Sequence, residues 1–226
     1  PVVTGLAIDH RKVAPGNVFG AFVGENFDGE DFIAAAVAAR DVAVVARPEA
    51  LYAAVEAVGG LPAVVKLIHG TQGRGVFLAH QMATISALLQ RAAELNRQAI
   101  VQEFIAEAGG RDRRLIVVGA QCVAAMERQA PGGEFRANLH RGATAAPFVP
   151  DKPTAALAVA AAAAHGLAVA GVDLILSRRG PLLLEVNSSP GLEGIEKATG
   201  INVAGKIVEL AENAVRSPTA LGKRDG

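Results

Sequence analysis

Residues 171–194 read Gly171-Val-Asp-Leu-Ile-Leu-Ser-Arg-Arg-Gly-Pro-Leu-Leu-Leu-Glu-Val-Asn-Ser-Ser-Pro-Gly-Leu-Glu-Gly194. Two apolar runs, 172–176 and 182–186, flank Arg178-Arg179-Gly180, which is typical of a β-hairpin with a three-residue loop and Gly180 in the left-handed conformation. In that register Asp173 lies opposite Glu185, and Asn187 follows on the same face of the hairpin. A two-residue loop would turn Asp173 to the other face.

Three oxygen-bearing side chains, those of Asp173, Glu185 and Asn187, therefore converge in the expected hairpin. Hard oxygen ligands suit magnesium, which uses one or two carboxylates and takes its other ligands from phosphates and water. The alternative is the solvated polar face of an ordinary hairpin, because half-exposed strands normally alternate polar and apolar residues. The pattern alone leaves both interpretations open.

The composition limits the partners of the chain. It has 226 residues, 51% of them hydrophobic, which is enough for one large or two smaller domains. Lys plus Arg equals Asp plus Glu at 22 each, so no global charge attracts nucleic acid or an acidic membrane surface. No run approaches the ~20 apolar residues of a membrane span, and the single cysteine, Cys122, fits a reducing compartment and a core position. We expect a cytoplasmic protein that binds neither membrane nor nucleic acid directly.

Hydrophobic periodicity and turn residues predict a mixed α and β chain. We expect strands at 2–8, 18–23, 42–46, 63–68, 76–79, 99–105, 115–118, 123–126, 172–176 and 182–186, and helices at 32–39, 48–60, 84–96, 153–165 and from 203 onward. The helix at 48–60 should bury Leu51, Ala54, Val55 and Val58. The helix at 84–96 should bury Ile85, Leu88, Leu89, Ala92 and Leu95.

The first fifty residues carry phrases of their own. These are Thr4-Gly-Leu-Ala-Ile-Asp-His-Arg-Lys-Val-Ala-Pro-Gly-Asn-Val-Phe19, Gly24-Glu-Asn-Phe-Asp-Gly29 and Asp31-Phe32-Ile33. This segment resembles the opening of Mur ligases of the MurE and MurF type, whose N-terminal domain holds the uridine end of a peptidoglycan precursor. The chain has no Gly-Lys-Ser/Thr tripeptide of a Walker-type loop, so it does not encode Mur chemistry.

Two further segments have the composition of anion sites. Gly70-Thr-Gln-Gly-Arg-Gly75 joins two expected strands, so its backbone N–H groups could close over phosphates, with Lys66 on the preceding strand as a point cation. Phe135-Arg-Ala-Asn-Leu-His-Arg-Gly142 gathers two arginines, an asparagine and a histidine. The alternative for the first segment is an ordinary glycine-rich turn, and the alternative for the second is a solvated basic loop.

Taken together, six phrases resemble the ATP-grasp fold, and most closely its RimK-type branch. In chain order they are Val65-Lys66-Leu67, Gly70-Thr-Gln-Gly73, Val101-Gln-Glu103, Phe135-Arg-Ala-Asn-Leu-His-Arg-Gly142, Gly171-Val-Asp173 and Leu184-Glu-Val-Asn-Ser-Ser-Pro-Gly-Leu-Glu-Gly194. The likeness covers about residues 56–215. It implies an α+β chain with the ATP-grasp fold, in which two α+β subdomains grip ATP, preceded by a small α/β Mur-like segment.

The implied domain organisation has four parts. Residues 1–50 form the Mur-like segment, 51–107 part of the small ATP-grasp subdomain with the glycine-rich loop, 108–217 the C-terminal subdomain with the metal site, and 218–226 a polar tail. The resemblance also implies that the family's further N-terminal domain is absent from these residues. We therefore expect nearly intact nucleotide and metal sites and a damaged surface for acceptor recognition.

The resemblance further implies roles for individual residues. Phosphates would bind Lys66 and the loop residues Gly70, Thr71, Gln72 and Gly73, adenine would bind at Glu103 and Phe104, and Asp112 would hold the ribose. Arg136, Ala137 and Asn138 would line the nucleotide site. Asp173, Glu185 and Asn187 would hold two magnesium or manganese ions, and Arg128 and Arg141 would stabilise the transferring group as catalytic residues.

The implied activity is an ATP-dependent carboxylate–amine ligase. Such an enzyme joins L-glutamate to the C-terminal carboxylate of a protein or peptide-like acceptor, such as a ribosomal protein, through an acyl phosphate. Two alternatives stay open on the sequence. The chain could bind ATP and magnesium without turnover, or it could bind a UDP-linked peptidoglycan precursor through its Mur-like segment.

Overall fold

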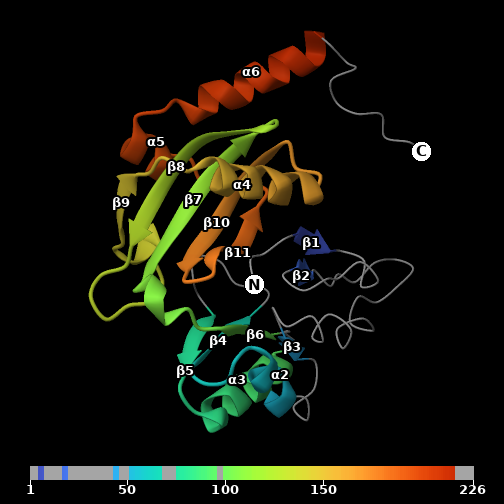
Figure 1. The fold of residues 1–226 in the computed structure, drawn as a ribbon, viewed down its shortest axis with the longest axis vertical. Coiled ribbons are helices and arrows are strands. Elements are labelled where there is room, and N and C mark those ends of the chain that lie inside the picture. The colour runs from blue at the N-terminus through green and yellow to red at the C-terminus, as the bar shows by residue number, and fades with distance from the viewer. Residues whose placement is uncertain are drawn as a thin grey trace, which may run out of the picture. The chain divides into compact units, whose positions relative to one another are not determined.

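The computed structural model describes residues 5–7, 17–19, 43–45, 51–67, 75–95 and 99–216. In this part of the chain the strands are β1 (Gly5–Ala7), β2 (Asn17–Phe19), β3 (Ala43–Val45), β4 (Ala63–Leu67), β5 (Val76–Ala79), β6 (Ala99–Glu103), β7 (Arg111–Val118), β8 (Gln121–Gln129), β9 (Thr144–Pro147), β10 (Val169–Ser177) and β11 (Gly180–Asn187). The helices are α2 (Leu51–Ala57), α3 (Met82–Glu94), α4 (Lys152–Ala164), α5 (Glu193–Thr199) and α6 (Val203–Arg216), with short 3-10 helices η4 (Ala106–Ala108) and η5 (Leu139–Arg141) (Figure 1).

The chain forms two compact units. Unit 1 comprises residues 1–107 together with 177–180, and unit 2 comprises residues 108–176 and 181–226. The main stretch of unit 1 ends at Glu107, and unit 2 begins at Ala108. The tip of the β10–β11 hairpin groups with unit 1, whereas the rest of both strands belongs to unit 2.

Unit 1 is built on a four-stranded sheet with the order β3-β6-β4-β5 and antiparallel pairing throughout. Residues of α2 and α3 form one core with those strands. The four residues expected to be buried, Leu51, Ala54, Val55 and Val58, are each 4% exposed, but α2 ends at Ala57, before the predicted end at 60, and Val58 follows it. The strands expected at 42–46, 63–68, 76–79 and 99–105 are also confirmed, with ends that differ by one or two residues.

Helix α3 differs from its prediction at one position. Ile85, Leu89 and Ala92 are buried and Leu88 packs partly against the core, but Leu95 is 48% exposed. The helix ends at Glu94, so Leu95 is the residue after the last helical turn and leaves the buried stripe. In the N-terminal segment, β1 and β2 overlap the strands expected at 2–8 and 18–23, and they form a parallel two-stranded sheet. The helix expected at 32–39 lies outside the described residues.

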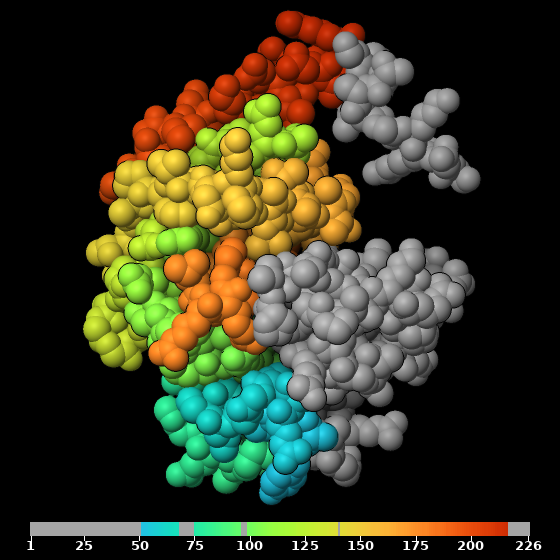
Figure 2. Space-filling view, viewed as in Figure 1, coloured from blue at the N-terminus to red at the C-terminus, as the bar shows by residue number. Residues whose placement is uncertain are grey.

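Unit 2 is built on a five-stranded sheet with the order β11-β10-β7-β8-β9. Helix α4 packs on one face of the sheet (Figures 1 and 2). There Ala158, Ala161 and Ala162 form one core with apolar residues of the central strands. Helices α5 and α6 pack on the other face through Ile195 and Val203. The second face also carries the charged residues described below.

The ends of the unit 2 helices follow from local chemistry. Asp151 begins α4, where its side chain accepts a hydrogen bond from the backbone N–H of Thr154. Gly166, with φ 65°, lies just after the helix, where a glycine in the left-handed region commonly ends a helix. Asn202 caps α6, because its Oδ1 accepts a hydrogen bond from the backbone N–H of Gly205 at 2.7 Å. In the described part of the chain, no helix has both the length and the apolar character to cross a membrane.

The β7–β8 hairpin contains a shift in register. Pairing passes from Val117–Cys122 to Ile116–Ala124, so that Val123 is skipped. Such a shift indicates a β-bulge, in which one strand carries an extra residue. Beyond the bulge each residue of that strand pairs one position further along, so its side chains change face relative to a regular hairpin. As a result, Arg128 pairs with Asp112.

Candidate functional site

Four charged residues form a chain across three neighbouring strands of unit 2. Arg114 of β7 lies opposite Asp173 of β10, and Asp112 of β7 lies opposite Arg128 of β8. Because Asp112 and Arg114 are two residues apart in one strand, all four side chains lie on the same face of the sheet. We call this group the ion-pair chain: Asp112, Arg128, Asp173 and Arg114.

Asp173 lies at the centre of the ion-pair chain and is 3% exposed. Arg114 donates to both of its oxygens, from Nε to Oδ1 at 2.7 Å and from Nη2 to Oδ2 at 2.6 Å. Arg128 Nη2 donates to Oδ2 at 3.0 Å. Burial alone would raise the pKa of Asp173, but the hydrogen bonds and charges of the two arginines lower it below its ordinary value. Asp173 is therefore a buried carboxylate that stays ionised.

Arg128 also holds Asp112 at the other end of the ion-pair chain. Its Nε and Nη2 donate to the two oxygens of Asp112 at 2.6 and 2.8 Å. Arg128 is 5% exposed, and its hydrogen bonds share its guanidinium between Asp112 and Asp173. Burial raises the pKa of Asp112 to about 6, against the lowering effect of Arg128. The sequence suggested that Arg128 contacts the transferring group, whereas the structure places it in the interior.

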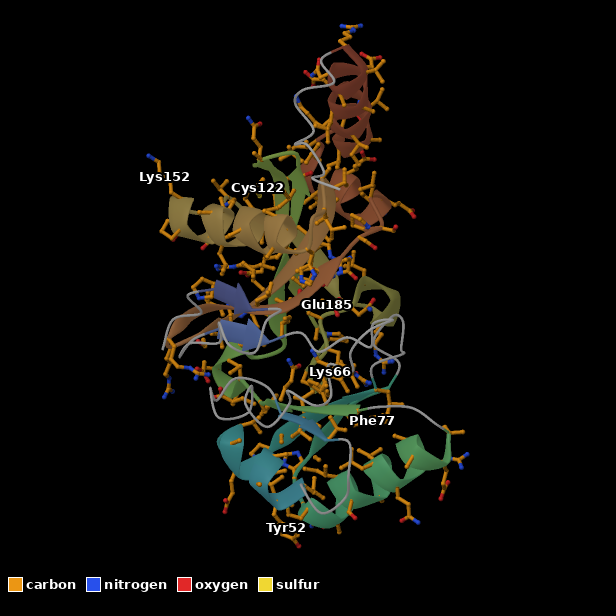
Figure 3. All side chains as sticks on the ribbon, turned by 90° about the vertical axis from the view of Figure 1, so that its right-hand side faces the viewer. Tyr52, Lys66, Phe77, Cys122, Lys152 and Glu185 are labelled. Carbon is orange, nitrogen blue, oxygen red and sulfur yellow. The ribbon has the colours of Figure 1, made fainter. Side chains whose placement is uncertain are left out.

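The metal residues expected on β11 are more accessible. The side chain of Glu185, labelled in Figure 3, is 54% exposed, and its Oε1 lies 3.9 Å from Arg114 Nη2. Asn187 Nδ2 donates to Glu185 Oε1 at 3.2 Å and approaches the carbonyl of Gly171 at 3.5 Å. Asp173 and Glu185 therefore lie on either side of Arg114, and Asn187 joins them through Glu185.

The hairpin loop agrees with its prediction in one respect and differs in another. Gly180 has φ 105°, within the left-handed region that favours glycine. However, β11 already begins at Gly180, so only Arg178 and Arg179 lie between the strands. A glycine of positive φ at the start of a strand is the geometry of a G1 bulge, which accompanies three-residue hairpin loops.

The tip of this hairpin contacts glutamates of unit 1. Arg179 forms an ion pair with Glu103, which we expected at the adenine. The backbone N–H of Arg178 donates to the carboxylate of Glu107 at 3.0 Å, and this bond is the main reason that the pKa of Glu107 is lowered. Ser177 Oγ donates to the carbonyl of Gly180 at 2.8 Å and closes the turn.

The basic loop at 135–142 is organised by Glu134, which the sequence analysis did not single out. Its carboxylate accepts from Arg136 Nε and Nη2 at 2.9 and 2.7 Å, and Arg141 Nη2 lies 3.4 Å away. The hydrogen bond from the Arg136 side chain is the main cause that lowers the pKa of Glu134 to about 2. The backbone N–H groups of Phe135 and Arg136 also donate to it. Glu134 therefore holds both predicted anion-binding arginines.

The remaining residues that were expected to bind the nucleotide lie partly in unit 2 and partly in unit 1. Ala137 is 5% exposed, and Asn138 precedes η5. In unit 1, Lys66 (Figure 3) pairs with Val76 of β5 and Ile100 of β6, on the sheet face opposite α2 and α3. Glu103 ends β6 and is exposed, and Phe104 follows it half-buried. Gly70, Thr71, Gln72 and Gly73 lie outside the described residues.

The oxygen atoms of Asp173, Glu185 and Asn187 have the chemistry that a hard divalent cation requires. Among the described residues, no three His, Cys, Asp or Glu side chains come together as metal ligands, so the amide oxygen of Asn187 is needed beside the carboxylates. Asp173 Oδ1 accepts one hydrogen bond from a described residue, and a carboxylate oxygen has two lone pairs. Glu185 and Asn187 add exposed or half-exposed oxygens. This set fits magnesium or manganese.

Arg114 and Glu134 are the functional candidates that the sequence analysis missed. Arg114 stands in Arg111-Asp-Arg-Arg114, where nothing local distinguishes it from its neighbours. Its partner Asp173 lies 59 residues further along the chain, so only the sheet order reveals the pair. Glu134 carried a usable signal, since it directly precedes a loop with two arginines.

Comparison with known proteins identifies the class of this chain. A family profile described as the RimK-like ATP-grasp domain matches residues 32–211. The chain belongs to the RimK-like ATP-grasp family. The match begins inside the segment that resembles Mur ligases, so residues 32–50 are included in the RimK-like region.

Curated relatives and solved structures agree with that class. The chain is 52% identical over 159 residues to the probable alpha-L-glutamate ligase of Legionella pneumophila (strain Corby), covering 70% of this chain and 53% of the relative. It is 51% identical over 171 residues to the probable alpha-L-glutamate ligase 1 of Shewanella frigidimarina (strain NCIMB 400), covering 75% of this chain and 56% of the relative. The chain thus spans about half the length of the curated relatives it matches.

The fold is that of ATP-grasp ligases. The structure of the ATP-grasp ligase PsnB complexed with minimal precursor, Mg and ADP aligns with a TM-score of 0.59 at 20% sequence identity. The alignment covers 76% of this chain and 52% of PsnB. The expectation of an α+β ATP-grasp fold is therefore confirmed.

Proposed function

We propose that this chain is part of an ATP-dependent carboxylate–amine ligase that joins L-glutamate to the C-terminal carboxylate of a protein or peptide-like acceptor. Membership of the RimK-like ATP-grasp family and the names of the curated relatives support the reaction class. The convergence of Asp173, Glu185 and Asn187 around Arg114 is the structural observation that supports it most directly.

The chemistry explains why such a reaction needs ATP. A carboxylate is a poor electrophile, so phosphorylation by ATP would first convert the acceptor carboxylate to an acyl phosphate. The amine of glutamate would then attack the carbonyl carbon and release phosphate. Stabilising the charge on the transferring phosphoryl group and on the tetrahedral intermediate is the main task of the protein.

We propose nucleotide-binding residues on each unit. In unit 1, Lys66 has apolar neighbours in register, Val76 and Ile100, which suit the flat face of a base beside a cation for the phosphates. The loop residues Gly70, Thr71, Gln72 and Gly73, with Glu103 and Phe104, would complete this part. In unit 2, Asp112 would hold the ribose and Arg136, Ala137 and Asn138 would contact the nucleotide.

Asp173, Glu185 and Asn187 would hold one or two magnesium or manganese ions, which when bound neutralise charge on the phosphates. Arg141, whose side chain is 34% exposed, would contact the transferring group. Because Arg128 is buried between Asp112 and Asp173, we propose that it acts through those two carboxylates. The acceptor would be a protein such as a ribosomal protein, or a peptide.

The proposal is tested by ADP formation from the full chain with ATP and magnesium. L-Glutamate carries both an amine and carboxylates, so it can be supplied alone as the first donor and acceptor. We expect ADP release that depends on L-glutamate and a glutamyl product seen by mass spectrometry. We also expect a loss of activity of at least about 100-fold in Glu185→Ala, the size of effect seen when one group that stabilises developing charge is removed. Glu209→Ala is the matched control, because that glutamate is 62% exposed in the same unit.

Each outcome separates the remaining possibilities. Equal ADP release from the wild type and Glu185→Ala would refute the metal assignment. Binding of ATP with magnesium but no ADP would assign the chain to nucleotide binding without turnover. A thermal shift with a UDP-linked peptidoglycan precursor and none with ATP would favour the Mur-like alternative instead.

A further inference from the structure

Arg114 contacts two of the proposed metal residues at once. Its fork of Nε and Nη2 holds both oxygens of Asp173 at 2.7 and 2.6 Å, and Nη2 lies 3.9 Å from Oε1 of Glu185. The Arg114 side chain is 18% exposed, so little of its guanidinium faces solvent. Asn187 joins the same group through its hydrogen bond to Glu185.

We propose that Arg114 is a positioning residue that fixes the carboxylates of Asp173 and Glu185 in the arrangement that binds a divalent cation. This inference rests on the proposed function, in which those residues hold the metal. Nothing in the sequence motif marks Arg114 for this role. The role follows from its place opposite Asp173 in the pairing of β7 with β10.

The geometry of the contact supports positioning over simple charge balance. A guanidinium bonded to both oxygens of a carboxylate fixes the carboxylate's rotation as well as its place, which a lysine ammonium does not do. Carboxylates that bind metals are commonly held by such outer contacts, and loss of one typically weakens metal affinity by 10–100-fold. Arg128 adds a third bond to Asp173 from the other side.

The competing view is that Arg114 is only a neighbouring positive charge. A cation beside a metal site repels the metal, so its removal would then tighten metal binding. The two views predict opposite signs for Arg114→Met. They also differ for Arg114→Lys, which keeps the charge and loses the fork.

The test is the affinity of the full chain for Mn2+ alone, measured by electron paramagnetic resonance of free Mn2+ without nucleotide. We expect Arg114→Lys and Arg114→Met to bind Mn2+ about 10–100-fold more weakly than the wild type. Arg113→Lys is the matched control. Arg113 is the preceding residue of β7, projects to the opposite face, bonds to Glu127 at 3.0 Å and lies 4.0 Å from the ring centre of Phe148. We expect its variant to bind Mn2+ as the wild type does.

The outcomes distinguish this inference from the proposed function. Unchanged or tighter Mn2+ binding in a folded Arg114→Lys chain would overturn the positioning role. Circular dichroism and urea unfolding establish that each variant is folded, and if neither Arg114 variant folds, Arg114 is a structural residue and the inference fails. Glu185→Ala checks the metal site itself. If this variant binds Mn2+ as tightly as the wild type, or if neither protein binds Mn2+, the metal assignment is overturned and the inference fails with it.

Discussion

Buried charge is the main residue-scale feature of unit 2. The two carboxylates and two guanidiniums of the ion-pair chain cancel formally, and each lies in hydrogen-bonding contact with an opposite charge. Removing one member would leave an uncompensated charge in the interior, which costs several kcal/mol, so these residues also contribute to stability. Variants of the ion-pair chain must therefore be judged by folding as well as by binding.

The raised pKa of Asp112 leads us to predict an unusual pH dependence of stability. Burial raises the pKa of Asp112 from 3.8 to about 6, so the folded chain holds this proton more tightly than the unfolded chain. The free energy of unfolding should therefore fall as pH rises from about 4 to about 6 and then level off. Across that window the free energy of unfolding of the wild type should fall by on the order of 1–3 kcal/mol relative to that of Asp112→Asn, as measured by urea unfolding at each pH.

Asp151→Asn is the control for this prediction. Hydrogen bonds from Thr154 lower the pKa of Asp151, so its contribution is present above the unfolded pKa and is lost as pH falls. The two variants should therefore show pH trends of opposite sign relative to the wild type. A stability difference between wild type and Asp112→Asn that stays constant from pH 4 to pH 7 would contradict the raised pKa.

The residues that could be proposed for the site from the sequence are local to one hairpin, whereas contacts that depend on distant strand pairing could not be foreseen. Asp173, Glu185 and Asn187 could be placed together because a single turn relates them. Arg114 could not, since its place opposite Asp173 depends on the order of strands in the sheet. The Arg128–Asp112 pair depends in addition on the skipped Val123, and a regular hairpin from the Val118–Gln121 pair would have set Glu127 opposite Asp112.

At the scale of elements, α4 shows how a helix of small side chains docks on a sheet. Ala158, Ala161 and Ala162 lie at 0, 4 and 1% exposure against Leu115 and Val172 of the central strands. Such close packing leaves no room for a larger side chain. The sequence predicted the helix and its ends, because an apolar run with a glycine stop is a local signal, but an alanine-rich helix has no distinct stripe from which to predict its buried face.

We predict that Ala158→Leu destabilises the chain by about 1–3 kcal/mol, the usual cost of inserting methylenes into a packed core. Ala163→Leu, on the exposed side of the same helix, should change the free energy of unfolding by less than about 0.5 kcal/mol. Urea unfolding of both variants measures the difference. Equal stabilities would show that α4 does not pack on the sheet through Ala158.

At the scale of the whole molecule, the two units have separate cores. The core of unit 1 joins α2 and α3 to their sheet, and the two cores of unit 2 lie on the two faces of its own sheet. No residue is shared between these clusters in the described part of the chain. Chains of this kind often unfold in more than one step.

We predict that the two units unfold separately, and the chain carries a natural probe for each. Tyr52 is the single tyrosine and there is no tryptophan, so tyrosine fluorescence reports on α2 of unit 1. Cys122 is the single cysteine, half-buried in β8 of unit 2, so its reaction with a disulfide reagent reports on unit 2. The two probes should give different midpoints in urea.

A matched pair of core variants assigns each transition to its unit. Leu89→Ala removes a buried leucine of unit 1 and Leu174→Ala one of unit 2, and each should cost about 2–5 kcal/mol. Leu89→Ala should lower only the midpoint that Tyr52 reports, and Leu174→Ala only the urea concentration at which Cys122 reacts. If either variant moves both probes equally, the units unfold as one cooperative body.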